Sequence, residues 1–374
     1  MASPFVSNTS EGFYNSGSAA DPTASFVGEE GGMARKGGAG EFRTAMAALY
    51  LVVCVAGLSG NALVIAATLK LDRLGSATTV YIFNLALADG LFMVGLPFIA
   101  VQNFRNSWPF GDPVCKLVMV LDGINQFTSV FCLTAMSVDR YVVLALGPGS
   151  RLAAWRTPRR AKAVAACLWL LSLAPVLPMA THFSASSGLC AVEPPPPAPR
   201  GSSSSLDGAA WWLVFLTYTF VLGFALPFGV MIAAYAALLV AVRARSRQGR
   251  RGDDDHGDAA FRSPEARRRE RQATRMVVAV VTAFAACWLP FYTLNFCALR
   301  QGGELAPPFA RGFEIAVLLS YAWSCANPVL YACLSDAFRT HFRALLCRAK
   351  GDRCDAVTEG FDLRDASDGD MSQA

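Results

Sequence analysis

Apolar residues are gathered into seven long runs along the chain, and the polar and charged residues are concentrated between them. The runs occupy residues 44–69, 78–101, 113–146, 163–185, 210–242, 276–299 and 312–334. A helix needs about 20 residues to cross the ~30 Å hydrocarbon core of a bilayer, and each run is long enough. The pattern therefore predicts an all-α membrane protein, a bundle of seven transmembrane helices.

The composition favours the same class. Hydrophobic residues make up 53% of the 374 residues and charged residues 16%, whereas soluble domains carry about 25% charged residues. Most of the eleven cysteines fall inside the apolar runs, where cysteine packs as a small hydrophobe. No Cys-x-x-Cys pair stands near a second one, so we expect no zinc site. No carboxylate pair, nucleophile–base pair or Gly-rich phosphate loop stands out, so we do not expect an enzyme.

The polar segments divide the chain further. The expected segments are a disordered N-terminal tail (1–43), the seven-helix domain (44–334), an amphipathic helix (335–347) and a disordered acidic tail (348–374). In the third segment Phe338 and Phe342 fall on one helical face, whereas Arg339 and Arg343 fall on another. This arrangement is typical of a helix that lies at the membrane interface.

The distribution of Lys and Arg predicts the orientation. Basic residues are concentrated in 147–162, in 243–275 and after residue 334, whereas 102–112, 186–209 and 300–311 carry one or two arginines each. Cytoplasmic loops carry the excess of Lys and Arg in membrane proteins. The N-terminus is therefore expected outside the cell and the C-terminus in the cytoplasm.

Three modifications are expected from this orientation. Asn8 begins an Asn-Thr-Ser sequon on the outer side, so we expect a glycan there. Cys115 and Cys190 both lie on the oxidising side, so we expect a disulfide that ties the outer loop to the third run. Cys347 ends the amphipathic segment, and both palmitoylation and an unmodified thiol remain open for it.

Short motifs in the runs resemble one large family. They are Gly-Asn at 60–61, Leu-Ala-Leu-Ala-Asp at 85–89, Asp-Arg-Tyr at 139–141, Cys-Trp-Leu-Pro at 287–290 and Asn-Pro-Val-Leu-Tyr at 327–331. Their order, within residues 45–347, is similar to that of the rhodopsin-like (class A) G-protein-coupled receptors. The stretches 120–129, 274–278 and 324–328 narrow the resemblance to the somatostatin receptors. The stretches 49–54 and 100–103 resemble type 3 most among the subtypes.

The chain also departs from that family. Trp323 stands where Asn is usual, and Gly90 where Glu is usual. The segment after Tyr141 lacks the usual His-Pro pair and is one residue longer before Pro148. The resemblance therefore implies a divergent member of the family.

The resemblance implies a receptor in the plasma membrane for somatostatin-like cyclic neuropeptides. It implies coupling to inhibitory G proteins, which lowers adenylyl cyclase activity, and arrestin as a further partner. It implies no nucleic acid and no cofactor other than a sodium ion. The rival classes are opioid-like or neuropeptide B/W-like peptide receptors and, more distantly, a transporter, although no repeated halves are visible. An opsin needs a lysine in the seventh run, where Tyr321 stands.

Asp122 is the candidate ligand anchor. An acid in the outer third of the membrane is energetically costly and is by default functional. An ammonium group would keep it charged through a charge-assisted hydrogen bond. Gln126, one helical turn away, is placed to add a second hydrogen bond. Phe291, Asn295 and Tyr321 are expected to line the same cavity. The alternative interpretation of Asp122 is a purely interhelical contact with Tyr321.

A second group of small oxygen-bearing residues lies at mid-membrane depth. Its members are Asp89, Asn125, Ser129, Ser324 and Asn327. A buried carboxylate needs partners, and the resemblance implies that this cluster holds a sodium ion. The alternative is a polar network bridged by water, which Trp323 favours.

The inner ends of the runs carry a candidate activation switch. Its expected members are Asp139, Arg140, Glu270, Trp288, Tyr235 and Tyr331. Arg140 is expected to pair with its neighbour Asp139 and with Glu270, and release of these pairs would let the sixth helix swing outward. Pro290 would supply the kink for that motion. Trp288 is expected to transmit the effect of ligand binding to the sixth helix. The alternative is that Trp288 only packs in the core.

Overall fold

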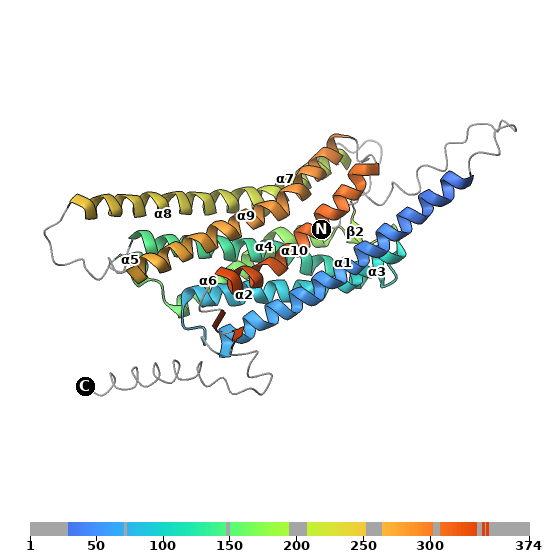
Figure 1. Ribbon diagram of the computed structural model, residues 1–374. Helices are drawn as coiled ribbons and strands as arrows, with labels where there is room; N and C mark the ends of the chain where they lie inside the picture. Colours follow the sequence, from blue (N-terminus) through green and yellow to red (C-terminus); the bar gives the residue numbers. More distant parts are fainter. Residues whose placement is uncertain are drawn as a thin grey trace.

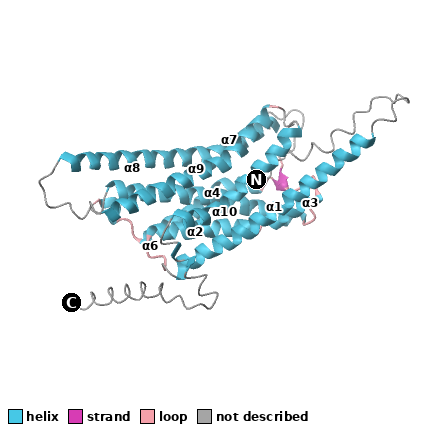
Figure 2. Cartoon of the chain, viewed as in Figure 1, coloured by secondary structure: helices cyan, strands magenta, loops and turns pink. Residues whose placement is uncertain are grey.

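The computed structural model describes residues 29–70, 73–146, 150–193, 208–251, 264–301, 307–334, 339–340 and 342–343. Almost all of these residues are helical, and two short strands form a hairpin (Figure 1, Figure 2). The elements are α1 (Glu29–Lys70), α2 (Ala77–Met93), α3 (Leu96–Arg105), α4 (Gly111–Tyr141), η2 (Val142–Leu146), α5 (Arg151–Ala154), α6 (Pro158–Ala180), β1 (Phe183–Ser184), β2 (Ala191–Val192), α7 (Gly208–Phe220), η3 (Val221–Ala225), α8 (Leu226–Arg251), α9 (Pro264–Arg300) and α10 (Pro307–Leu334).

The expected seven spans are confirmed. Seven helical stretches are long and apolar enough to cross a membrane: Gly40–Lys70, Ala77–Arg105, Gly111–Tyr141, Pro158–Ala180, Ala210–Ala241, Val278–Arg300 and Phe309–Cys333. Two of them are composite. The second joins α2 to α3 across a break at Gly95, and Pro97, which has no backbone N–H, stands at the start of α3. The fifth joins α7 to α8 through the π-helical turn η3.

Two helix boundaries differ from the sequence prediction. α1 begins at Glu29, so part of the segment expected to be a disordered tail is helical. The glycines at 31, 32, 37, 38 and 40 disfavour a helix there, so this part of α1 is an extension propagated from the apolar span. α6 begins at Pro158 and ends at Ala180, whereas the prediction was 163–185. The chain leaves this helix because Phe183 enters strand β1, where it pairs with Val192.

The extra residue expected after Tyr141 coincides with a distortion of the helix. Residues Val142–Leu146 form the π-helix η2 directly after α4. A π-turn accommodates one more residue than an α-turn. The insertion is therefore absorbed at the end of α4.

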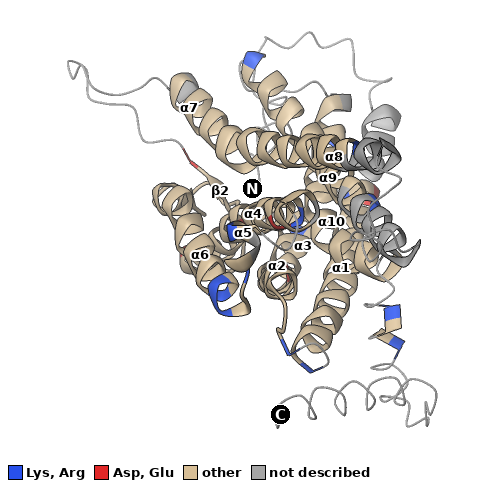
Figure 3. Ribbon diagram, turned by 90° about the vertical axis from the view of Figure 1, so that its left-hand side faces the viewer, with Lys and Arg blue, Asp and Glu red and all other residues tan. Residues whose placement is uncertain are grey.

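The two ends of the bundle differ in composition. At one end, here called the disulfide end, the β1–β2 hairpin lies against α4 and Cys190 is bonded to Cys115. The opposite end, here called the basic end, faces the viewer in Figure 3, where blue segments mark Lys and Arg at the start of α6 and beside α5. Arg159 and Arg160 at the start of α6 are exposed.

The expected amphipathic segment 335–347 is described only at four positions. Phe342 is buried against the bundle, whereas Arg339 and Arg343 are exposed, as the two-faced pattern predicts. Arg339 Nη2 donates to the carbonyl oxygen of Cys333 at 3.0 Å. A cationic side chain thus caps the last turn of α10. Asn8 and Cys347 lie outside the described residues, so their modifications stay predictions.

Glycines let α1 approach its neighbours closely, as small residues do in membrane bundles. A Cβ at Gly60 would lie 3.0 Å from Cβ and 3.1 Å from Cγ of Pro328. The next residue, Asn61, donates from Nδ2 to the carbonyl oxygen of Ser324 at 3.0 Å. Gly60 and Asn61 therefore fix α1 against α10.

Replacing Gly60 by valine should push α1 and α10 apart, because the ring of Pro328 cannot change rotamer to make room. Overpacking of this kind costs about 1–3 kcal/mol, and the thermal melting temperature of the purified protein in detergent should fall by several degrees. Gly90→Val is the matched control, since no heavy atom lies within 4 Å of a Cβ there. Equal melting temperatures for the two variants would contradict this account.

Candidate functional site

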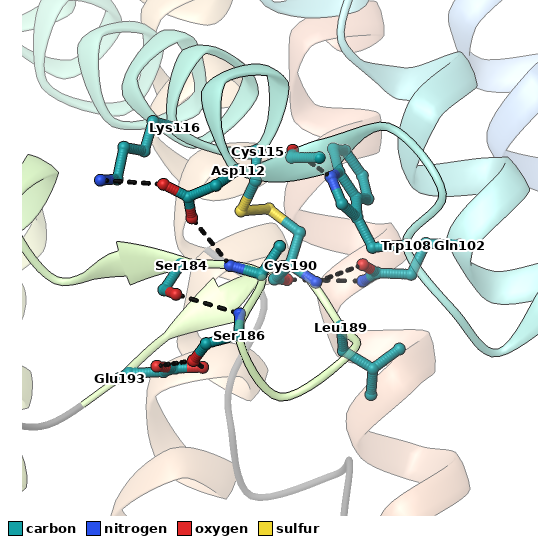
Figure 4. The surroundings of a disulfide bond; sticks show 12 residues. Gln102, Trp108, Asp112, Cys115, Lys116, Ser184, Ser186, Leu189, Cys190 and Glu193 are labelled. Carbon is teal, nitrogen blue, oxygen red and sulfur yellow. Dashed lines mark hydrogen bonds and ion pairs between the residues drawn. A yellow bond between two sulfur atoms is a disulfide. The ribbon is translucent and has the colours of Figure 1, made fainter.

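The disulfide end is covered by the segment that carries Cys190. The disulfide to Cys115 joins Cα atoms 5.4 Å apart, which confirms the expected pair. Gln102 on α3 holds the same segment through its amide, whose Oε1 accepts from the Cys190 N–H at 2.7 Å and whose Nε2 faces the Cys190 carbonyl at 3.5 Å (Figure 4). Asp112 Oδ1 accepts from the N–H of Ala185 at 3.1 Å. The hairpin is thus fixed from both α3 and α4.

Asp122 lies beneath this cover, on the buried face of α4. Its side chain is 4% exposed. Tyr321 of α10 donates its hydroxyl to Asp122 Oδ2 at 3.4 Å. The ring of Tyr321 packs against Tyr50 of α1 and Phe92 of α2, with centroids 5.9 and 5.0 Å away. The interhelical contact considered from sequence is present, and at this length it is a weak hydrogen bond.

Gln126 connects three helices near the same position. Its Nε2 donates to the hydroxyl of Tyr292 on α9 at 2.6 Å, and that hydroxyl donates to the carbonyl oxygen of Thr219 on α7 at 3.1 Å. The other amide atom, Gln126 Oε1, is buried and has no hydrogen-bond partner among the described residues. A buried acceptor without a partner costs about 1–3 kcal/mol. Gln126 is therefore prepared to accept a hydrogen bond from a bound molecule.

The other two expected pocket residues lie on α9. Phe291 is buried between Trp288, Tyr292 and Phe313, with centroids 5.9, 5.3 and 6.1 Å away. Asn295 donates from Nδ2 to the Phe291 carbonyl oxygen at 2.8 Å. Phe291 thus joins α9 to α10 through its contact with Phe313. The amide nitrogen of Asn295 is bound within its own helix.

The five expected members of the mid-membrane cluster do converge. Asp89 is fully buried and accepts from Ser129 Oγ at 3.2 Å, from Ser324 Oγ at 2.8 Å and from Asn327 Nδ2 at 2.9 Å. Asn125 donates from Nδ2 to Ser324 Oγ at 3.2 Å. Three helices, α2, α4 and α10, therefore meet at one carboxylate.

The oxygens of this cluster suit a monovalent cation. Asn327 Oδ1 is buried without a hydrogen-bond partner among the described residues. The Ser129 hydroxyl lies within reach of both Asp89 Oδ1 and Asn125 Oδ1, but it has one proton and cannot satisfy both. One carboxylate with several neutral oxygens is a donor set for a hard cation of low charge. No group of three or more His, Cys, Asp or Glu suited to a metal occurs in the part of the chain that was described.

Trp323 packs beside the cluster and points its ring toward α9. It is 2% exposed and meets Phe284 edge-to-face, with centroids 5.5 Å apart. Phe284 in turn stacks on Phe224, with centroids 5.5 Å apart, and lies 6.4 Å from Trp288. The departure from the family pattern therefore adds an aromatic contact between α10 and α9.

At the basic end the expected Asp139–Arg140 pair is not what the structure shows. Asp139 is bound by Arg156, which lies just before α6, and Arg140 donates to Thr78 Oγ1 at 2.7 Å. Arg156 binds the carboxylate of Asp139 with two donors, Nε and Nη2, and Arg140 is left to Thr78. The side chain of Glu270 lies outside the described set, and its pairing with Arg140 stays a prediction.

The remaining switch residues are buried among the helices. Tyr235 donates its hydroxyl to Ser137 Oγ at 2.6 Å, which joins α8 to α4. Trp288 and Tyr331 are 5% and 1% exposed. Trp288 lies next to Phe284, which contacts Trp323 and Phe224. These positions agree with core packing and leave their role in switching as a prediction.

Comparisons with known proteins place this arrangement in a family. The family described as 7 transmembrane receptor (rhodopsin family) matches residues 60–331. Somatostatin receptor type 5 of Bos taurus is 46% identical over 303 residues, which are 81% of this chain and 76% of the relative. The chain belongs to the somatostatin receptor family. Type 3 of Mus musculus is also 46% identical, over 80% of this chain and 68% of the relative, and type 2 of Mus musculus is 38% identical, over 86% and 83%.

Membership in the somatostatin receptor family agrees with the resemblance inferred from the motifs. The similarity to type 3 is confirmed, and the type 5 relative is equally similar, at 46% identity. The polar cluster and the pocket acid of this receptor thus lie on the elements that the motifs predicted.

Several interacting residues of this receptor were not found from sequence. Tyr292 follows Phe291 directly in the sixth apolar run. A buried tyrosine hydroxyl needs a hydrogen-bond partner, and this requirement could have identified Tyr292 from the sequence. Gly223 in η3 was also missed; a Cβ there would lie 3.0 Å from Gln126 Nε2 and 3.1 Å from the Tyr292 hydroxyl. The glycine therefore makes room for the Gln126–Tyr292 hydrogen bond.

Gly223→Ala should break that hydrogen bond and lower the stability of the purified receptor by about 1 kcal/mol. In a thermal melting assay, Gly223→Ala combined with Tyr292→Phe should cost less than the sum of the single changes, because both remove the same bond. Gly229→Ala on α8 is the control, since nothing lies within 4 Å of its added Cβ. Strict additivity of the first two changes would rule out this role for Gly223.

Proposed function

We propose that this protein is a receptor for somatostatin-like cyclic peptides that couples to inhibitory G proteins and lowers adenylyl cyclase activity. The observation that carries the proposal is the buried carboxylate of Asp122, one helical turn from Gln126 and its unsatisfied carbonyl oxygen. The relatives at 38–46% identity are named somatostatin receptors. Arrestin is proposed as a further partner.

The proposed recognition step follows from the energetics of a buried acid. An ammonium group from the peptide would bind Asp122 by a charge-assisted hydrogen bond, which is stronger than the long contact from the Tyr321 hydroxyl that it displaces. The same ammonium, or a neighbouring N–H of the peptide, would donate to Gln126 Oε1. The bond to Gln126 Oε1 removes a desolvation cost that the unliganded protein carries.

The proposed orientation places the disulfide end outside the cell and the basic end in the cytoplasm of a plasma-membrane protein. The Lys and Arg bias of the connecting segments supports it. A disulfide forms in the oxidising compartment, and Cys115–Cys190 lies at the end proposed to face outward. Peptide and G protein would then bind at opposite ends of the bundle.

Asp122→Asn should abolish the fall in cyclic AMP that a somatostatin-type peptide causes in cells expressing the chain. Loss of one partner of a buried charged pair costs about 2–5 kcal/mol, so peptide affinity should fall by roughly two orders of magnitude. Surface expression, measured with an epitope tag, should be unchanged. Glu41→Gln is the control, because Glu41 is an exposed acid on α1.

A response that survives Asp122→Asn would contradict the role of Asp122 as the ligand anchor, but it would not contradict the assignment as a receptor. A panel of somatostatin-type, opioid and neuropeptide B peptides on the same cells decides between the receptor classes. A response confined to opioids or to neuropeptide B would overturn the proposed ligand.

We also propose that the Asp89 cluster binds sodium. Asp89, Asn125, Ser129 and Asn327 would supply the oxygens, as the unsatisfied Asn327 Oδ1 suggests. Neutralisation of the buried carboxylate is the chemistry that the ion would supply.

Agonist affinity should then be about fivefold or more lower in sodium chloride than in N-methylglucamine chloride of equal ionic strength. Asp89→Asn should remove the difference between the two salts, whereas Glu41→Gln, at an exposed acid on α1, should preserve it. Equal affinities of the unaltered receptor in both salts would show that the cluster works without sodium.

A further inference from the structure

Four side chains from three elements form a closed polar cluster at the basic end, here called the Arg156 cluster: Thr78, Asp139, Arg140 and Arg156. Arg156 binds both carboxylate oxygens of Asp139, with Nε 2.5 Å from Oδ1 and Nη2 3.0 Å from Oδ2. Arginine is suited to this contact because its planar guanidinium matches a carboxylate with two parallel donors. Asp139 is buried, and the side chain of Arg156 is 26% exposed.

Thr78 of α2 uses its hydroxyl completely within this cluster. It donates to Asp139 Oδ2 at 3.0 Å. It accepts from Arg140 Nη2 at 2.7 Å and from Arg156 Nη2 at 3.0 Å. One donor and two acceptor sites are all that a hydroxyl has. The two arginines therefore share the Thr78 hydroxyl, and Arg156 is the one that binds the carboxylate of Asp139.

The backbone around Arg156 directs its side chain toward Asp139. The next residue, Thr157, is the N-cap of α6 in extended conformation, with φ −98° and ψ 149°, and its hydroxyl accepts from the N–H of Arg160. Pro158 at the first helical position disfavours any helical conformation for Thr157. Trp155 is held on the other side by the guanidinium of Arg160, 4.2 Å from its ring centroid. The segment is thus positioned by its own sequence.

We infer that Arg156 is a positioning residue for Arg140 in the switch. Because Arg156 binds the carboxylate of Asp139, that carboxylate does not form an ion pair with Arg140. Arg140 therefore stays available to a partner at the basic end. This inference rests on the proposed coupling to a G protein. The relevant competition is between two arginines for one acid, and two-pronged binding favours Arg156.

The test uses the full-length receptor in membranes, reconstituted with a purified inhibitory G protein, and measures guanine-nucleotide exchange stimulated by a somatostatin-type peptide. Arg156→Gln should reduce stimulated exchange about five- to tenfold, because Asp139 then captures Arg140. Arg156→Lys should be intermediate, since lysine cannot make the two-pronged contact. Arg159→Gln removes the same charge from an exposed position nearby and should leave exchange unchanged.

A combined variant separates positioning from a merely structural role. Adding Asp139→Asn to Arg156→Gln should restore much of the exchange, because a neutral amide no longer captures Arg140. A structural role for Arg156 would give no such rescue. Higher exchange in Arg156→Gln than in the unaltered receptor, or a combined variant as poor as Arg156→Gln alone, would overturn the inference.

A second measurement does not depend on ligand or G protein. Thermal melting of the purified receptor should show that Arg156→Gln and Asp139→Asn are strongly non-additive, since each removes the same contact. Additive effects would overturn the contact itself. A receptor that responds to no peptide would instead count against the proposed function, and one that responds equally with and without Arg156 would count against this inference alone.

Discussion

A carboxylate buried among membrane-spanning helices must be bound by polar groups from neighbouring helices, because lipid and apolar side chains have no hydrogen-bond donors. This constraint acts on Asp89, Asp122 and Asp139. Asp89 collects two hydroxyls and an amide, Asp139 collects a guanidinium and a hydroxyl, and Asp122 meets the Tyr321 hydroxyl. Each set of donors crosses between helices. Each buried acid therefore stabilises the contact between its own helix and the neighbouring element that supplies its hydrogen-bond donor.

The aromatic residues of the bundle connect two of these polar positions. Trp323 is adjacent in sequence to Ser324, which binds Asp89, and its ring contacts Phe284 on α9. Phe284 leads through Trp288 to Tyr292, which binds Gln126. A continuous set of contacts thus joins the cluster at Asp89 to the pocket. This path passes through α9, the helix that contains Pro290.

Much of the fold follows from the sequence because membrane thickness leaves little choice of element. Seven apolar runs of sufficient length gave seven spans, and the five cluster residues met as their family positions implied. The errors arose where the membrane does not determine the answer. The start of α1 lies in a glycine-rich stretch without an apolar pattern. The ends of α6 lie at the edge of the apolar region, where the N-cap at Thr157 and the strand pairing of Phe183 determine them. Arg156 was read only as one basic loop residue among several, because its partner depends on how the N-cap at Thr157 directs it.

The organisation of α4 explains how one helix serves several partners. Successive residues on a helix are about 100° apart, so Asn125 and Gln126 face different neighbours: Asn125 binds α10, whereas Gln126 binds α9. Ser129, one turn beyond Asn125, reaches Asp89 on α2. Further along, Asp139 reaches α2 and the segment before α6. A displacement of α4 along or about its axis would alter all of these bonds together, so the surroundings of Gln126, the Asp89 cluster and the basic end all depend on the position of this one helix. Arg156 acts at the end of that element, where one loop residue determines which side chain the last acid of α4 binds.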